Sequence, residues 1–214
     1  MTLRLSRLHF PVTALGPGRR LGIWTQGCTI GCPGCISRDT WPSTVDGQPA
    51  VPVPDVLAWC VRHAGVDGVT ISGGEPSEQP AALTELVAGL DRHRRERGWD
   101  LLCYTGVEED EFARRCPEVH GLVDALITGP YRAAEPTDLV WRGSANQRLV
   151  PLTELGRQRY GRWVDARTDR PALQIDVDGT GVRMIGVPRR GDLSRLERRL
   201  AAAGVRLEGV SWRP

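Results

Sequence analysis

One stretch decides how the rest of the sequence is interpreted: Trp24-Thr25-Gln26-Gly27-Cys28-Thr29-Ile30-Gly31-Cys32-Pro33-Gly34-Cys35. Half of the six cysteines fall within eight residues of this stretch, in the spacing C-x₃-C-x₂-C. Thiolates this close together on a loop bent by Gly and Pro can converge on one soft metal centre. Three local cysteines leave one metal position without a protein ligand, and an open position is typical of a catalytic site.

Other special residues follow predicted strands in the same way. The cysteine loop follows a strand at 21–25, Gly73-Gly74-Glu75-Pro76 follows a strand at 69–71, and Thr105-Gly106 follows a strand at 101–104. Strands alternate with helices here, which predicts an α/β fold with a mainly parallel sheet. The carboxyl ends of such strands share one rim, so we expect these loops to be neighbours at an active site.

The hydrophobic pattern predicts the remaining elements along the chain. The other strands are expected at 2–10, 122–128, 173–177, 182–187 and 205–210. Helices are expected at 55–64, 83–97, 108–116 and 192–203. Asp178-Gly179-Thr180-Gly181 is a hairpin signal, and 131–171 is a long polar stretch with weak periodicity.

The two main motifs together resemble a known superfamily. The motif C-x₃-C-x₂-C followed by Gly73-Gly74-Glu75-Pro76 resembles that of the radical S-adenosylmethionine (SAM) enzymes. The short motifs Gln26-Gly27-Cys28 and Cys32-Pro33-Gly34-Cys35 are similar to those of the small activating-enzyme branch of these enzymes. That branch includes the activating proteins of anaerobic ribonucleotide reductase and the 4Fe-4S single cluster domains. The resemblance covers roughly residues 1–150 and implies a partial (β/α) barrel with about five or six strands.

The resemblance also implies the cofactors and the residues that hold them. A [4Fe–4S] cluster would be bound by Cys28, Cys32 and Cys35. SAM would bind its open iron and be positioned by the residues of two strand-end turns, Gly73, Gly74, Glu75, Thr105 and Gly106. An electron from flavodoxin or ferredoxin would then cleave SAM to a 5′-deoxyadenosyl radical. No catalytic side chain is assigned.

Each motif has a plainer alternative. Structural zinc needs four ligands, and no histidine is spaced to complete the cysteine set. A thiol–disulfide site at Cys32 and Cys35 leaves Cys28 unexplained. Glu75 is also compatible with an ordinary strand-to-helix turn, and Thr105-Gly106 with an ordinary loop. Cys60, Cys103 and Cys116 are expected in the core.

A polar segment at 142–148, Arg142-Gly143-Ser144-Ala145-Asn146-Gln147-Arg148, is also similar to this branch. It has two interpretations: it lines the cleft and holds SAM or substrate, or it is a satisfied surface loop. We treat 1–214 as a single radical SAM domain, in which 1–150 is the core and 151–214 adds C-terminal strands and a helix.

Three functional classes remain open. The first is an activase that makes a glycyl radical on a partner protein. The second is a free-standing radical SAM enzyme that modifies a peptide or small molecule, with 151–214 serving that purpose. The third is a non-radical iron–sulfur or thiol redox protein.

Composition limits the partners. The net charge is +2, from 28 basic and 26 acidic residues, which gives no reason to expect nucleic acid or a membrane surface as partner. All basic side chains apart from histidine are arginine, so no lysine chemistry is available. No apolar run approaches the ~20 residues that span a bilayer. We therefore expect a cytoplasmic enzyme with reduced thiols.

Overall fold

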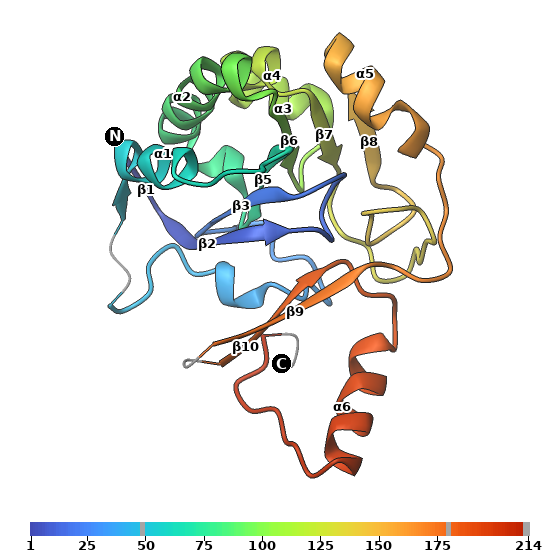
Figure 1. Ribbon diagram of the computed structural model, residues 1–214. Coiled ribbons are helices and arrows are strands. Elements are labelled where there is room, and N and C mark those ends of the chain that lie inside the picture. The colour runs from blue at the N-terminus through green and yellow to red at the C-terminus, as the bar shows by residue number, and fades with distance from the viewer. Residues whose placement is uncertain (48–49, 179–180, 212–214) are drawn as a thin grey trace.

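The computed structural model describes residues 1–47, 50–178 and 181–211. Its centre is a six-stranded sheet in the order β2-β3-β5-β6-β7-β8 (Figure 1). β3, β5, β6 and β7 run parallel, and the edge strands β2 and β8 run antiparallel to their neighbours. This confirms the predicted α/β fold with about six mainly parallel strands. The strands are β2 (Leu5–Val12), β3 (Arg20–Thr25), β5 (Gly68–Gly73), β6 (Asp100–Tyr104), β7 (Ala125–Thr128) and β8 (Arg148–Pro151).

Four helices cover one face of the sheet (Figure 1). In the longest of them, α2, Leu83, Leu86 and Leu90 are fully buried at helical spacing against the sheet. α2 ends at Gly98, whose φ of +68° is the left-handed C-cap that glycine adopts freely. The helices are α1 (Val53–Val61), α2 (Pro80–Arg97), α3 (Glu109–Arg115) and α4 (Pro117–Leu122).

The other face of the sheet carries a second, smaller core. Side chains alternate along β6, so that Leu101 and Cys103 face the helices while Leu102 packs on the opposite side with Tyr160. Tyr160 comes from α5 (Glu154–Tyr160), which follows β8. This smaller core combines aliphatic side chains such as Leu102 and Ile127 with the buried ring of Tyr160.

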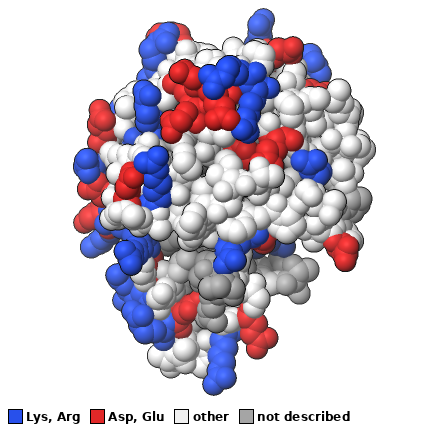
Figure 2. All heavy atoms as spheres, turned by 180° about the vertical axis from the view of Figure 1, so that it is seen from behind, with Lys and Arg blue, Asp and Glu red and all other residues white. Residues whose placement is uncertain are grey.

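The C-terminal part forms a separate unit below the main sheet (Figure 1). β9 (Leu173–Asp178) and β10 (Gly181–Gly186) form an antiparallel pair, as predicted, although Gly179 and Thr180 of the turn lie outside the described residues. α6 (Asp192–Ala202) follows. Seen from behind, basic side chains gather at the lower left, where α6 lies (Figure 2).

Short elements complete the chain. β1 (Thr2–Leu3) pairs with β4 (Val51–Pro52). Single 3₁₀ turns are η1 (Arg38–Thr40), η2 (Pro76–Glu78) and η3 (Gly161–Trp163). In the part of the chain that the structure describes, no helix has both the length and the apolarity to cross a bilayer.

Three predictions about elements were wrong in part. No strand forms at 205–210, because Val205 is 48% exposed and Gly209 adopts a turn conformation with φ of +60°. The stretch 131–171 is more regular than expected, because it contains β8 and α5. A strand was predicted from residue 122, but the helix α4 occupies 117–122 and begins at Pro117, whose missing N–H costs nothing at the first helical position.

Candidate metal centre

The cysteine loop leaves the buried end of β3 and is fixed by hydrogen bonds to the segment around η1. The N–H of Gly27 donates to the carbonyl of Thr40 at 2.8 Å, and that of Cys28 donates to the carbonyl of Trp41 at 3.0 Å. The buried side-chain amide of Gln26 donates to two carbonyl oxygens of the same segment, at 3.0 and 2.7 Å. The base of the loop is therefore rigid before any cofactor binds.

The three clustered cysteines differ from the other three in exposure. Cys28, Cys32 and Cys35 are all partly exposed on the loop. The N–H of Cys35 donates to the carbonyl of Cys32 at 3.0 Å, which closes a turn around Gly34 with φ of +81°. The remaining cysteines are buried core residues, as predicted: Cys60, Cys103 and Cys116.

The clustered thiols have to be deprotonated before they can bind a metal. Within residues 1–47, 50–178 and 181–211, no group of three or more His, Cys, Asp or Glu side chains is placed to hold one metal ion. Burial raises the pKa of the Cys28 and Cys32 thiols, so their deprotonation is coupled to metal binding.

The turn after β5 packs directly on the start of the cysteine loop. The N–H of Gly74 donates to the carbonyl of Thr25, and the N–H of Glu75 donates to the carbonyl of Gly27, both at 2.8 Å. A Cβ on Gly74 would lie 2.1 Å from the Gly27 oxygen. Gly73 has φ of +106°, and a Cβ there would lie 2.5 Å from the Thr25 backbone. Only glycine permits this approach of two backbones.

Glu75 joins this turn to the next strand end. Its carboxylate is 1% exposed and accepts three hydrogen bonds, from the Ser77 N–H at 3.0 Å, the Thr105 hydroxyl at 2.8 Å and the Gly106 N–H at 2.7 Å. A Cβ on Gly106 would lie 2.6 Å from Cδ1 of Ile30 in the cysteine loop. The structure thus brings together all three loops that the sequence placed on one rim.

Two residues that tie these loops together were not identified from the sequence. The Glu78 carboxylate accepts from the N–H and the hydroxyl of Thr29 at 2.8 and 2.6 Å. The Gln79 amide accepts from the Arg4 N–H at 2.7 Å and donates to the Gln26 carbonyl at 3.2 Å. Their only sequence signal is their position just after Glu75. Polar and acidic residues are common at the start of a helix because they interact favourably with the helix dipole, so this position does not indicate a tie between loops.

The polar segment supports a fourth loop, which follows β7. The Gln147 amide donates to the Gly129 carbonyl at 3.0 Å, and Asn146 donates to the next carbonyl at 2.8 Å. Tyr131 in this loop lies beside the cysteines, since a Cβ on Gly34 would be 3.4 Å from its ring. The polar segment is therefore mostly satisfied by internal hydrogen bonds, although Oδ1 of Asn146 is buried without a hydrogen-bond partner among the described atoms.

The structure has a three-thiol loop at the carboxyl rim of a mainly parallel α/β sheet, and glycine turns pack against this loop. These features define a [4Fe–4S] domain of the radical SAM class. The family model described as "4Fe-4S single cluster domain" matches residues 14–150. The chain belongs to this family, and its cofactors are a [4Fe–4S] cluster and SAM.

Curated relatives agree with this assignment. The anaerobic ribonucleoside-triphosphate reductase-activating protein of Salmonella typhi is 30% identical over 145 residues, which cover 65% of this chain and 93% of the relative. The protein of the same name from Escherichia coli (strain K12) shows the same identity and coverage. That of Enterobacteria phage T4 is 30% identical over 141 residues, covering 65% of this chain and 88% of the relative.

A solved structure also aligns with this chain. QueE from Escherichia coli aligns with a TM-score of 0.43 and 18% identity, over 97% of this chain and 93% of that one.

Proposed function

We propose that this chain is an activase that generates a glycyl radical on a partner enzyme of the anaerobic ribonucleotide reductase kind. The supporting observation is that the alignment spans 93% of the Salmonella typhi activating protein, so nearly the whole length of that relative has a counterpart here. The three-thiol loop and the closely packed rim suit the same chemistry.

The proposed roles follow from position. Cys28, Cys32 and Cys35, which are partly exposed on the loop, would hold the cluster. When bound, the two cofactors supply the radical chemistry, in which SAM is cleaved reductively to a 5′-deoxyadenosyl radical. The SAM-facing wall is formed by two turns, whose residues are Gly73, Gly74, Glu75, Thr105 and Gly106.

The chain's own part is to hold the rim in one geometry. The Glu75 carboxylate already accepts three hydrogen bonds from its own turn and the neighbouring loop. Its role is therefore to position the turns rather than to act as a free charge toward SAM. Tyr131, in the loop after β7, lies against Gly34. A small reductant, flavodoxin or ferredoxin, delivers the electron. Neither nucleic acid nor a membrane is required.

Electron paramagnetic resonance tests the proposal. The protein is reconstituted anaerobically with iron and sulfide, and then incubated with dithionite, SAM and an anaerobic ribonucleotide reductase. We expect a glycyl radical doublet on the reductase that depends on all three additions. Cys32→Ala should abolish it, whereas Cys60→Ala, which removes a thiol from the core under α1, should retain it. A cluster that forms and cleaves SAM but never transfers the radical would contradict the activase role.

A second function is favoured by the C-terminal part. Residues 151–214 lie beyond the family match, which ends at residue 150, and they include β9, β10 and α6. An enzyme that modifies a peptide or small molecule could use this addition to hold its substrate. It would release 5′-deoxyadenosine in step with that substrate and without any reductase present.

A further inference from the structure

A second cavity lies on the side of the sheet that carries Tyr160, and it reaches the cysteine loop at Tyr131, which lines the cavity and also lies against Gly34. Its volume is about 900 Å³, within the range of small-molecule sites. Its walls come from the turn between β2 and β3, the stretch between β7 and β9, and the residues after β10. None of the residues proposed to hold the cluster or SAM lines it.

The lining is strongly basic. Six arginines line the cavity against one described carboxylate, that of Asp138. The whole chain has 28 basic and 26 acidic residues, so this excess is local. Clefts lined by one sign of charge concentrate ligands of the opposite sign. The arginines are Arg142, Arg162, Arg167, Arg170, Arg189 and Arg190.

Arg142 forms the most buried part of this charge. It is 6% exposed, and its guanidinium donates to the carbonyls of Val140 at 3.2 Å and Trp163 at 3.1 Å. No carboxylate of the described chain lies within ion-pair distance of it. Burial lowers the pKa of Arg142, and the nearby Asp165 offsets only part of that effect. A buried cation with only neutral partners is costly unless an anion joins it.

Two of the lining residues carry a buried donor without a partner. Nη2 of Arg189 and Nε1 of Trp163 are buried and have no hydrogen-bond partner among the described atoms. Both groups can only donate, so the missing partner must be an acceptor. These two donors and the charge of Arg142 belong to residues of one cavity wall.

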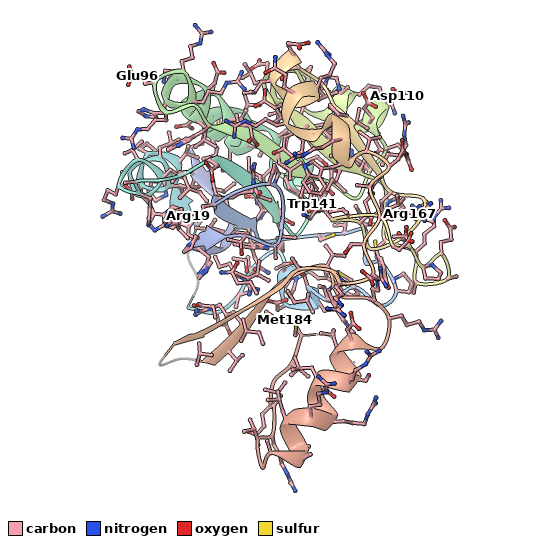
Figure 3. All side chains as sticks on the ribbon, turned by 45° about the vertical axis from the view of Figure 1, so that its right-hand side comes forward. Arg19, Glu96, Asp110, Trp141, Arg167 and Met184 are labelled. Carbon is pink, nitrogen blue, oxygen red and sulfur yellow. The ribbon has the colours of Figure 1, made fainter. Side chains whose placement is uncertain are left out.

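Aromatic rings complete the wall. The rings of Trp141 and Trp163 lie 5.0 Å apart between centroids. Trp141 has φ of +61°, a conformation that a bulky residue adopts only when its surroundings enforce it. Figure 3 shows Trp141 close to the sheet and Arg167 on the outer side of the same stretch. Arg167 pairs with Asp138 and is largely exposed, so it lies at the mouth of the cavity.

We propose that this cavity binds a phosphorylated small molecule that carries a flat ring, which is the chemistry of a nucleotide. Phosphate oxygens would accept from the guanidinium groups of Arg142 and Arg189, and the ring would lie against Trp141. Several guanidinium groups against one carboxylate favour an anion with more than one negative charge.

Isothermal titration calorimetry on the cluster-loaded protein, under anaerobic conditions, tests this site. The probes are ADP, inorganic pyrophosphate, adenosine and citrate. We expect ADP to bind most tightly, pyrophosphate more weakly, and adenosine and citrate not measurably. Quenching of tryptophan fluorescence should accompany ADP binding. No ADP binding at millimolar concentration, or citrate binding as tightly as ADP, would overturn the proposal.

Variants separate a specific site from general charge attraction. Arg189→Gln should weaken ADP binding by about tenfold or more, because it removes a charged donor. Arg142→Gln should do the same, with near-ultraviolet circular dichroism confirming the fold. Arg157→Gln removes the same charge from the exposed face of α5 and should leave affinity unchanged. Equal losses in all three variants, or displacement of ADP by excess SAM, would refute a separate nucleotide site.

Discussion

The Glu75 carboxylate accepts a 2.7 Å hydrogen bond from the backbone N–H of Gly106, which joins the loops that follow β5 and β6. Because Gly106 also touches Ile30 of the cysteine loop, this one bond connects three strand ends. Charge-assisted hydrogen bonds that a buried carboxylate accepts are stronger than hydrogen bonds between neutral groups. The geometry of the whole rim therefore depends on a side chain that has little capacity left to contact a ligand.

Glu75→Gln should destabilise the protein by ~1–3 kcal/mol, because both carboxylate oxygens face N–H donors and an amide must turn its NH₂ toward one of them. The loss is measured by denaturant unfolding of the apo protein. Glu78→Gln is the matched control, since one oxygen accepts both bonds from Thr29 and an amide oxygen can do the same. Similar losses for both variants would argue against the special role of Glu75.

Gly74→Ala should prevent the rim from closing. The added Cβ would lie 2.1 Å from the Gly27 carbonyl, and overpacking of this kind costs ~1–3 kcal/mol. We expect less iron and sulfide per chain after reconstitution, measured by chemical analysis. Gly121→Ala in α4 meets no atom within 4 Å and should instead stabilise the helix by ~0.5–1 kcal/mol. Full cluster loading in Gly74→Ala would contradict the packing argument.

The sequence predicted the rim correctly because its signals are local. The cysteine spacing, Gly73-Gly74-Glu75 and Thr105-Gly106 each follow an apolar run, and parallel strands place such ends together. The tie made by the Glu75 carboxylate depends on the distance between loops, which no local pattern contains. Glu78 and Gln79 were missed for the same reason.

The region after β7 was predicted poorly because its order comes from tertiary contacts. Four residues of β8 pair with β7, which is too short a run for periodicity to reveal. The cavity arginines are spread from Arg142 to Arg190 and converge only in the folded chain. A strand was predicted at 205–210 from apolar residues alone, but those residues have no strand to pair with in the described structure.

Asp100→Asn should be the most destabilising change outside the rim. Arg20 and Asp100 are both fully buried and form an ion pair of 2.6 Å, and Tyr160 and Arg159 also donate to the carboxylate. Removing one charge leaves the other uncompensated, at a cost of ~3–5 kcal/mol. Denaturant unfolding measures it.

The control for that variant is an exposed pair. Glu111→Gln breaks the surface ion pair with Arg115 in α3 and should change stability by less than about 0.5 kcal/mol. If the two variants differ little, then the Arg20–Asp100 pair does not hold the amino ends of β3 and β6 together as the structure implies.

Thiol labelling distinguishes the cluster cysteines from the core cysteines. In apo protein, iodoacetamide at about pH 8 should alkylate only the partly exposed Cys28, Cys32 and Cys35, because the thiolate is the reactive form and must be accessible. Burial raises the pKa of Cys60 to about 12 and that of Cys116 to about 11, so both stay protonated. Peptide mass spectrometry identifies the modified sites.

Cluster reconstitution should then protect all three labelled thiols together, since each would be bound to a different iron of one cubane. Removal of the cluster by a chelator and an oxidant should restore their labelling. Unchanged labelling of any one of them in cluster-loaded protein would remove that cysteine from the ligand set. Protection by zinc alone, without sulfide, would point to an ordinary metal site in place of a cluster.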